Sequence, residues 1–135
     1  MSLAVHIPVP PSALFQVDLE AAEKGIPLSV LEEFSAASGI VLKDLLDVVI
    51  PARTLKHRRA RKEAFNLDES DRLARVLRLY EQAVRVFGQP EKARHWLLQP
   101  QKRLEERTPL AMMRSEIGGR MVEEWLIQID EGMFA

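Results

Sequence analysis

The stretch from Asp68 to Phe87 constrains the fold of this chain more than any other. Its apolar residues recur every three or four positions, which is the spacing of one face of an α-helix. They are Leu73, Val76, Leu77, Tyr80, Val84 and Phe87. Carboxylates in its first turn, at Asp68, Glu69 and Asp71, suit the positive end of a helix dipole. Gly88 is a typical helix stop. The sequence therefore predicts a long amphipathic helix over 68–87.

The remainder of the chain also has helical spacing, and we find no convincing alternation of apolar and polar residues that would indicate a strand. Further helices are expected over 12–23, 29–38 and 42–48, from Pro51 through a basic segment, over 90–97, from Pro109 onward and over 120–131. Gly118 and Gly119 are interpreted as a break before the last helix, because glycine is a poor helix former. The predicted fold class is all-α, with a flexible arm over 1–11, a helix-turn-helix-like domain over 12–66 and a small helical domain over 67–135.

Composition narrows the class of protein. Apolar residues make up 47% of the 135 residues, so the chain can bury a core. No apolar run is long enough to span a membrane, and the first residues lack the pattern of a secretory signal, so we expect neither a membrane protein nor an exported one. The absence of cysteine excludes disulfides and thiolate metal sites. It fits a reducing compartment, and a cytoplasmic location is expected.

Residues that could carry out catalysis are scattered along the chain. The three histidines, His6, His57 and His95, lie in different segments, and none has a second ligand at metal-binding spacing. The sequence has no P-loop and no dinucleotide-binding glycine pattern, and its carboxylates are mostly spaced as helical ion pairs. We therefore expect no enzymatic activity, no metal and no cofactor.

The charge of the chain is unevenly distributed, although its net value is only −1. Residues 53–62 read RTLKHRRARK, in which six of ten residues are Lys or Arg and none is acidic. A dense basic strip in an otherwise balanced protein indicates a local contact with an anionic partner. A solvated helix face is the ordinary alternative, and it stays open on the sequence alone.

The basic strip follows a short helix and a tight turn, which is the pattern of a helix-turn-helix. Residues early in the second helix of such a motif reach base edges. Arg53 is the expected base contact because its planar fork suits guanine, with Thr54 and His57 on the same side of the helix. The residues expected at phosphates are Lys56, Arg58, Arg59, Arg61 and Lys62.

The turn of this motif departs from the usual pattern. Helix-turn-helix motifs usually have a small residue in the first helix and glycine at the turn, whereas Leu46 and Val49 occupy those places here. A distorted turn, or DNA binding that is weak or lost, is therefore an alternative to the standard motif.

The last predicted helix and the residues after it offer a second candidate surface. Trp is favoured at interface hot spots, and Met adapts to irregular surfaces. The residues expected to bind a protein partner are Met121, Glu124, Trp125, Gln128, Ile129, Met133 and Phe134. For Trp125 and Ile129, as for Val122 and Leu126, closing the domain core is the alternative.

Short pieces of sequence form an ordered pattern from about residue 40 onward. They include Arg53–Thr54–Leu55 with Arg58–Arg59, Glu69–Ser70–Asp71–Arg72–Leu73, Val86–Phe87–Gly88, Trp96–Leu97, Arg107–Thr108–Pro109–Leu110, and Ile129 with Gly132. In this order they resemble the Xre-type antitoxins that carry a ParS/MbcA-like toxin-binding domain. This family often has glycines before the Arg–Thr–Pro–Leu piece, where this chain has Glu105 and Glu106. The loop there is therefore expected to take another conformation.

The resemblance implies two partners. The domain over 12–66 would bind operator DNA and repress its own operon, commonly as a homodimer. The domain over 67–135 would bind a RES-domain toxin that consumes NAD, and hold it inactive. Two other functions stay open: a helix-turn-helix regulator whose C-terminal half serves only dimerisation or ligand sensing, and a scaffold protein of the same family without a toxin partner.

Overall fold

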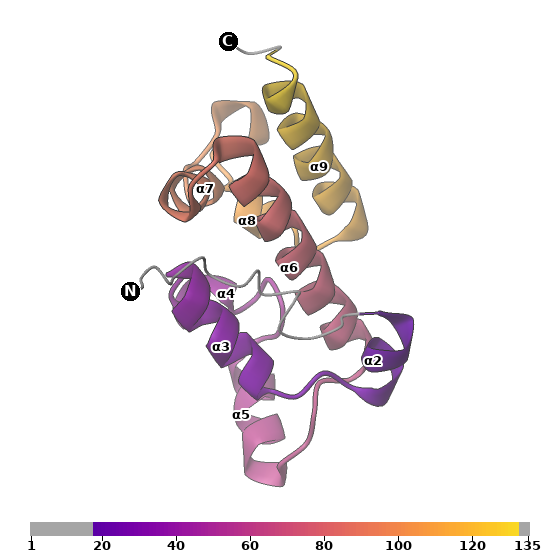
Figure 1. Ribbon diagram of the computed structural model, residues 1–135. Helices are drawn as coiled ribbons and strands as arrows, with labels where there is room; N and C mark the ends of the chain where they lie inside the picture. Colours follow the sequence, from indigo (N-terminus) through magenta and orange to yellow (C-terminus); the bar gives the residue numbers. More distant parts are fainter. Residues whose placement is uncertain (1–17, 133–135) are drawn as a thin grey trace, which may run out of the picture.

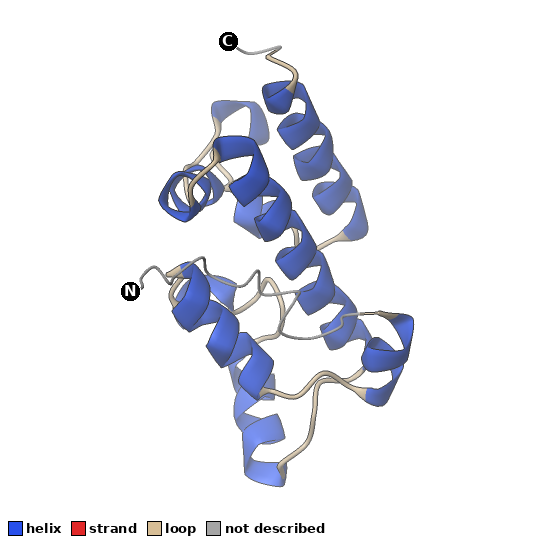
Figure 2. Cartoon of the chain, in the orientation of Figure 1, coloured by secondary structure: helices blue, strands red, loops and turns tan. Residues whose placement is uncertain are grey.

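The computed structural model describes residues 18–132, which fold mainly into helices (Figures 1 and 2). These are α2 (Leu19–Lys24), α3 (Ser29–Ser38), α4 (Leu42–Leu45), α5 (Ala52–Arg61), α6 (Leu67–Phe87), α7 (Pro90–Leu97), the 3-10 turn η1 (Lys102–Leu104), α8 (Pro109–Met112) and α9 (Glu116–Asp130). Extended pairing in this part of the chain is limited to two isolated bridges. The predicted all-α class is therefore confirmed. The predicted arm over 1–11 and part of the predicted helix over 12–23 lie outside the described residues.

The central element is α6, whose N-terminal part contacts α2 and whose later turns contact α7 and α9 (Figure 1). It begins at Leu67 because Asn66 caps it. The Asn66 side chain accepts a hydrogen bond from Glu69 N at 2.8 Å, and the Glu69 carboxylate accepts one from Asn66 N at 2.9 Å. This reciprocal capping box satisfies backbone donors that the first turn leaves free. Gly88 ends α6 with a φ of 80°, as predicted.

The core is built around both sides of α6. Of the six residues predicted on its apolar face, Leu73, Val76, Leu77 and Tyr80 are buried and Val84 and Phe87 are half-buried. Leu79 lies off that face and is nevertheless fully buried. It is buried because other helices cover α6 on more than one side. Tyr80 also meets Phe34 of α3 edge to face, with 5.2 Å between ring centroids, which joins the N-terminal helices to α6.

The first helix of the helix-turn-helix is shorter than predicted. α4 ends at Leu45 instead of continuing to Val48, because the backbone becomes extended at Leu46 and left-handed at Asp47, where φ is 69°. The turn closes through a hydrogen bond of 3.0 Å from Asp47 N to Ile50 O. The left-handed residue of this turn is thus Asp47, and Asp tolerates that conformation better than most residues.

Replacing Asp47 by glycine is expected to stabilise the protein by about 0.5–1 kcal/mol, because glycine adopts a positive φ without steric cost. The matched control is Asp44→Gly, which alters a nearby aspartate inside α4 and is expected to destabilise by about the same amount. Urea denaturation followed by circular dichroism measures both. Destabilisation by both substitutions would show that the Asp47 side chain itself holds the turn.

The start of α9 was predicted wrongly. Instead of breaking the chain, Gly118 and Gly119 lie inside the first turns of α9, which begins at Glu116. Ser115 is its N-cap, and its Oγ accepts a hydrogen bond from Gly118 N at 3.0 Å. Both glycines are buried, and each faces another segment at close range.

The loop before α8 contains the two glutamates that stand where the family often has glycine. Glu105 and Glu106 have φ values of 57° and 68°. Both therefore adopt the left-handed region that glycine favours. The expectation that this loop differs in conformation from that of its relatives stays a prediction.

Candidate functional site

α5 carries part of the basic segment on one exposed face, and it lies at the end of the molecule away from α9 (Figure 1). Leu55 is buried and Thr54 is half-buried, so this side of α5 faces the core. At 3.6 residues per turn the opposite face carries Arg53, Lys56, His57 and Arg61, which are all exposed. Among the described residues, none of the Lys or Arg side chains on this face forms an ion pair, and neither does Lys62 after it. This face can therefore meet an anionic partner directly.

Arg58, one of the predicted phosphate contacts, is half-buried and bonded to two carboxylates. Its Nε and Nη2 donate to the two carboxylate oxygens of Glu69 at 3.0 and 3.1 Å, and its Nη1 donates to Glu63 at 3.1 Å. Hydrogen bonding to Glu69, and secondarily to Glu63, raises the pKa of Arg58 above its ordinary value. The basic segment contains no acid, but the fold brings carboxylates to it. Three of the five N–H donors of Arg58 are used in these contacts. Its contact with phosphate stays a prediction.

Arg59 also has a partner, but a weaker one. Its Nη2 lies 2.8 Å from Glu32 of α3, and the two side chains are 46% and 57% exposed. Exposed ion pairs of this kind contribute about 0–1 kcal/mol. Arg59 therefore stays a predicted phosphate contact.

The residues predicted to bind a protein partner differ in how exposed they are in the structure. On α9, Met121 and Glu124 are exposed, whereas Trp125, Gln128 and Ile129 are half-buried. Val122 and Leu126 are fully buried, so core packing, which was open for both, is their role. Met133 and Phe134 lie outside the described residues.

Trp125 belongs to an aromatic cluster at the end of α6. Its ring lies edge to face with Trp96 at 6.4 Å, and Trp96 in turn lies 5.5 Å from Phe87. The guanidinium of Arg103 stands 4.5 Å above the Trp125 ring, a cation–π contact. Because both tryptophans of the chain lie in this cluster, its tryptophan fluorescence reports on the cluster.

Ile117 is an exposed apolar residue that the sequence analysis missed. It is 76% exposed, and Met121, one turn later on α9, is 40% exposed. Residues four positions apart on a helix are neighbours on one face. The break assumed at the two glycines had placed Ile117 outside the helix. Recognising Ser115 as the N-cap would have found it.

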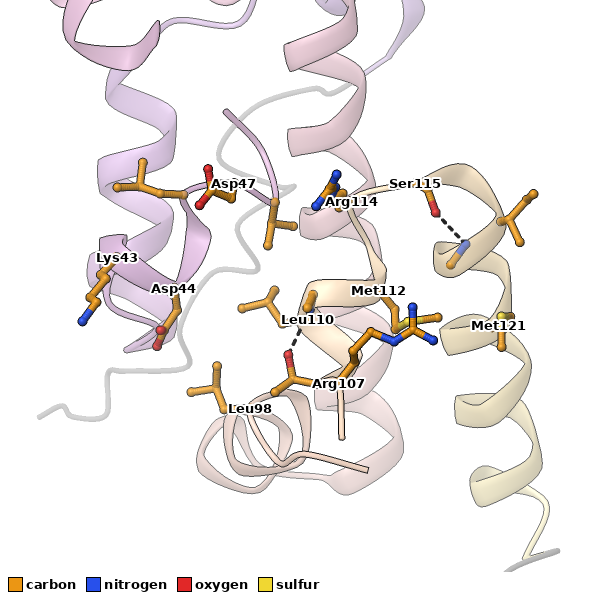
Figure 3. A pocket seen from close by; sticks show the side chains of 16 residues that line it. Lys43, Asp44, Asp47, Leu98, Arg107, Leu110, Met112, Arg114, Ser115 and Met121 are labelled. Carbon is orange, nitrogen blue, oxygen red and sulfur yellow. Dashed lines mark hydrogen bonds between the residues drawn. The ribbon is translucent and has the colours of Figure 1, made fainter. Parts of the chain in front are cut away.

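Ile117 and Met121 line a groove of about 960 Å³ between the α4 turn and the α8–α9 segment. Figure 3 shows Lys43, Asp44 and Asp47 on one side of this groove and Met112, Ser115 and Met121 on the other. Its remaining apolar lining includes Leu46, Val48, Leu98 and Leu110. The groove is therefore lined by both apolar and charged residues, and both halves of the chain contribute to it.

Other kinds of site find no support in the part of the chain that the structure describes. No three His, Asp or Glu side chains lie close enough together there to hold a metal ion. None of the helices in 18–132 is sufficiently long and apolar for a transmembrane segment.

Comparison with known proteins identifies the two halves of the chain. Residues 18–78 match the family model for the antitoxin Xre-like helix-turn-helix domain, and residues 82–132 match that for the antitoxin Xre/MbcA/ParS C-terminal toxin-binding domain. The two matches meet within α6, so this helix contributes to both.

Three curated relatives bear the name Antitoxin Xre. The one from Pseudomonas putida is 44% identical over 86 residues, which is 64% of this chain and 54% of that protein. This match thus spans about half of that relative. The one from Yersinia enterocolitica is 28% identical over 127 residues, covering 93% and 86% of the two chains. The one from Photorhabdus laumondii is 30% identical over 112 residues, covering 82% and 76%. With its helix-turn-helix fold and helical C-terminal half, the chain belongs to the Xre antitoxin family.

Proposed function

We propose that this protein is a type II antitoxin with two activities. It neutralises a RES-domain, NAD-consuming toxin by direct binding, and it represses its own operon by binding promoter DNA, as a cytoplasmic homodimer. We assign it no catalytic activity of its own. The observation that carries the proposal is the separation of two unlike surfaces, a cationic face on α5 and an exposed apolar face on α9.

The cationic face supports operator binding. Arg53 lies in the first turn of α5, where a helix-turn-helix meets base edges, and its side chain is exposed. Lys56 and Arg61 lie on the same face, where they would contact phosphates. Since Arg58 is already bonded to Glu69, fewer cations remain for DNA than the basic segment suggests.

The apolar face supports toxin binding. Ile117 and Met121 expose large side chains beside a groove, and they lie within the residues matched by the toxin-binding family model. An apolar surface rimmed by polar groups is typical of a protein interface. Met121 and Glu124 are the predicted contacts that are exposed on α9, and Ile117 is added to them.

Co-expression with the product of the adjacent gene tests the proposed function. A stable complex that restores growth to cells poisoned by that protein is the expected result. NAD should fall when the neighbouring protein is expressed alone and recover when this chain is co-expressed. If neither a complex nor rescue is obtained while operator binding persists, the chain is a transcriptional regulator and the antitoxin proposal is wrong.

Substitution of the cationic face tests operator binding. Arg53→Ala is expected to weaken operator binding by about 1–3 kcal/mol and to relax sequence preference, whereas Lys56→Ala should reduce the slope of log affinity against log salt by about 1. Arg120→Ala is the control, because Arg120 is an exposed arginine on α9 in a pair with Glu116. Fluorescence anisotropy of a labelled operator, titrated at several salt concentrations, measures all three. An effect of Arg120→Ala as large as that of Arg53→Ala would exclude the α5 face as the DNA site.

A further inference from the structure

We propose that Glu69 and Arg72 of α6 are positioning residues for DNA recognition, although neither lies on the exposed face of α5. The inference rests on the proposed DNA-binding function. It starts from two contacts that α6 makes with the helix-turn-helix, one with α5 itself and one with the turn before it.

The first contact fixes the rotation of α5 about its axis. Arg58 and Glu69 form a two-pronged pair, with Nε and Nη2 on the two carboxylate oxygens at 3.0 and 3.1 Å. A two-pronged arginine–carboxylate pair fixes direction as well as distance. Arg58 lies away from the exposed face of α5, so holding it inward holds Arg53 outward.

The carboxylate of Glu69 is itself held rigidly. Its side chain is only 5% exposed, and its Oε1 also accepts the hydrogen bond from Asn66 N at 2.9 Å. The capping box of α6 therefore holds the Glu69 carboxylate in place, and this carboxylate orients α5 through Arg58. Each oxygen of this buried carboxylate has a donor, as a charge removed from water requires.

The second contact holds the turn. Arg72 Nε donates to the backbone carbonyl of Val49 at 2.8 Å. Val49 lies in the turn that has Asp47 in the left-handed region and no glycine. Glu69 and Arg72 are three residues apart and so share a face of α6. One face of α6 thus sets the position of the turn and of α5 together.

This arrangement predicts opposite changes in nonspecific and operator-specific DNA binding. General destabilisation of the fold would instead weaken both. Glu69 neutralises Arg58, which keeps one cation of the basic segment away from DNA. Loss of the Glu69 charge should leave Arg58 with only its exposed pair to Glu63, and so increase attraction to any DNA. It should also leave α5 less well oriented and so weaken recognition of the operator.

The test compares Glu69→Gln with Asp71→Asn. Glutamine at residue 69 can keep the capping box but not the charge. Asp71 is two residues away on α6 and pairs with Arg75 at 3.1 Å, so its substitution removes the same charge and an ion pair without touching α5. Anisotropy titrations with operator and with scrambled duplex of equal length, across salt concentrations, give the specificity ratio and the salt slope. Thermal melting verifies that each variant is folded.

Glu69→Gln is expected to lower the specificity ratio by about tenfold or more and to steepen the salt slope by about 0.9, the value for one added phosphate contact. Asp71→Asn should change neither quantity. An unchanged ratio in folded Glu69→Gln, or an equal loss of affinity for both duplexes, overturns the proposal for Glu69. A wild-type protein that does not distinguish the operator from scrambled DNA refutes the proposed function, and this inference with it.

A second variant keeps the test decisive if Glu69→Gln does not fold. Arg72→Lys retains the charge but loses the Nε donor to Val49. It is expected to lower the specificity ratio while leaving the salt slope unchanged. A wild-type ratio in Arg72→Lys overturns the positioning role of Arg72.

Discussion

Replacing Gly118 by alanine is expected to destabilise the protein by about 3 kcal/mol and to lower its melting temperature by about 10 °C. A Cβ at Gly118 would overlap the carbonyl oxygen of Met112 and lie 2.9 Å from its carbon and 3.0 Å from Ser115 Oγ. The obstacle is backbone, which cannot rotate aside as a side chain can. The better helix propensity of alanine offsets only about 1 kcal/mol of this cost.

The junction at Gly118 has little freedom to adjust. Met113, next to the obstructing carbonyl, accepts a hydrogen bond at 3.0 Å from Arg75 of α6, and the Arg75 side chain is only 9% exposed. Met113 itself is fully buried. Moving Met112 away from a new methyl group would therefore disturb the contact between α6 and the α8–α9 segment.

Two other glycines provide graded controls. Gly119→Ala meets the Arg75 side chain, with 2.7 Å from the added Cβ to Cδ, and a side chain can shift at an expected cost of about 1–2 kcal/mol. Gly88→Ala meets no atom within 4 Å, so only its positive φ costs energy, about 1 kcal/mol. Urea denaturation at matched protein concentration measures all three. A Gly118→Ala variant no less stable than Gly88→Ala would mean that α9 can move away from α8 freely.

The helices that the sequence predicted well are those whose ends are marked locally. Gly39 and Gly88 stop α3 and α6, and Pro90 starts α7. Thr108 caps α8 by accepting a hydrogen bond from Ala111 N at 3.0 Å. Each of these residues starts or stops a helix through contacts with residues only a few positions away. Such helix ends can therefore be predicted from the sequence alone.

The prediction of a helix break at Gly118 was wrong because the role of this glycine depends on tertiary packing, not on its neighbours in the sequence. Local propensity makes a pair of glycines a break. In the structure they are needed because α9 passes close to the Met112 carbonyl and to Arg75. That proximity depends on how α8 and α9 pack on α6, and no local pattern shows it. The same error hid Ile117, since the exposed face of α9 could be recognised only once the helix began at Glu116.

The DNA-binding candidates show a similar limit. The sequence located the basic helix and placed Arg53 in its first turn, and both follow from helical spacing. It could not show that Arg58 is bonded to Glu69, eleven residues away, or Arg59 to Glu32, 27 residues away. Charge density along a segment therefore overestimates the charge that a partner meets, because tertiary contacts use part of it.

An aspartate in place of Ile117 is expected to abolish toxin neutralisation while leaving the protein as stable as before. Ile117 is 76% exposed, so its replacement should change the free energy of unfolding by no more than about 0.5 kcal/mol. In a complex, a carboxylate there would lose its water without a partner, and the expected loss of toxin affinity is about 2–4 kcal/mol. Met121→Asp should act in the same direction, since Met121 is its neighbour on α9 and is 40% exposed.

α9 supplies the matched control in Ile127→Asp. Ile127 is also an exposed isoleucine of α9, at 45%, but it lies on another side of the helix, near Arg85 and Val86 of α6. The substitution is chemically identical, so any difference between the two variants comes from position. We expect Ile127→Asp to bind toxin as the wild type does, and both variants to bind operator DNA normally.

Three readouts separate the possible results: toxin affinity by calorimetry, growth rescue, and unfolding by urea. Loss of toxin binding by Ile117→Asp with a wild-type unfolding curve would place the interface on the groove side of α9. Loss by Ile127→Asp alone would move it to the side that faces the end of α6, and the proposed toxin-binding face would be wrong. The proposed operator-binding face lies on α5, at the other end of the molecule. A variant that also lost DNA affinity would therefore indicate misfolding instead of a damaged interface.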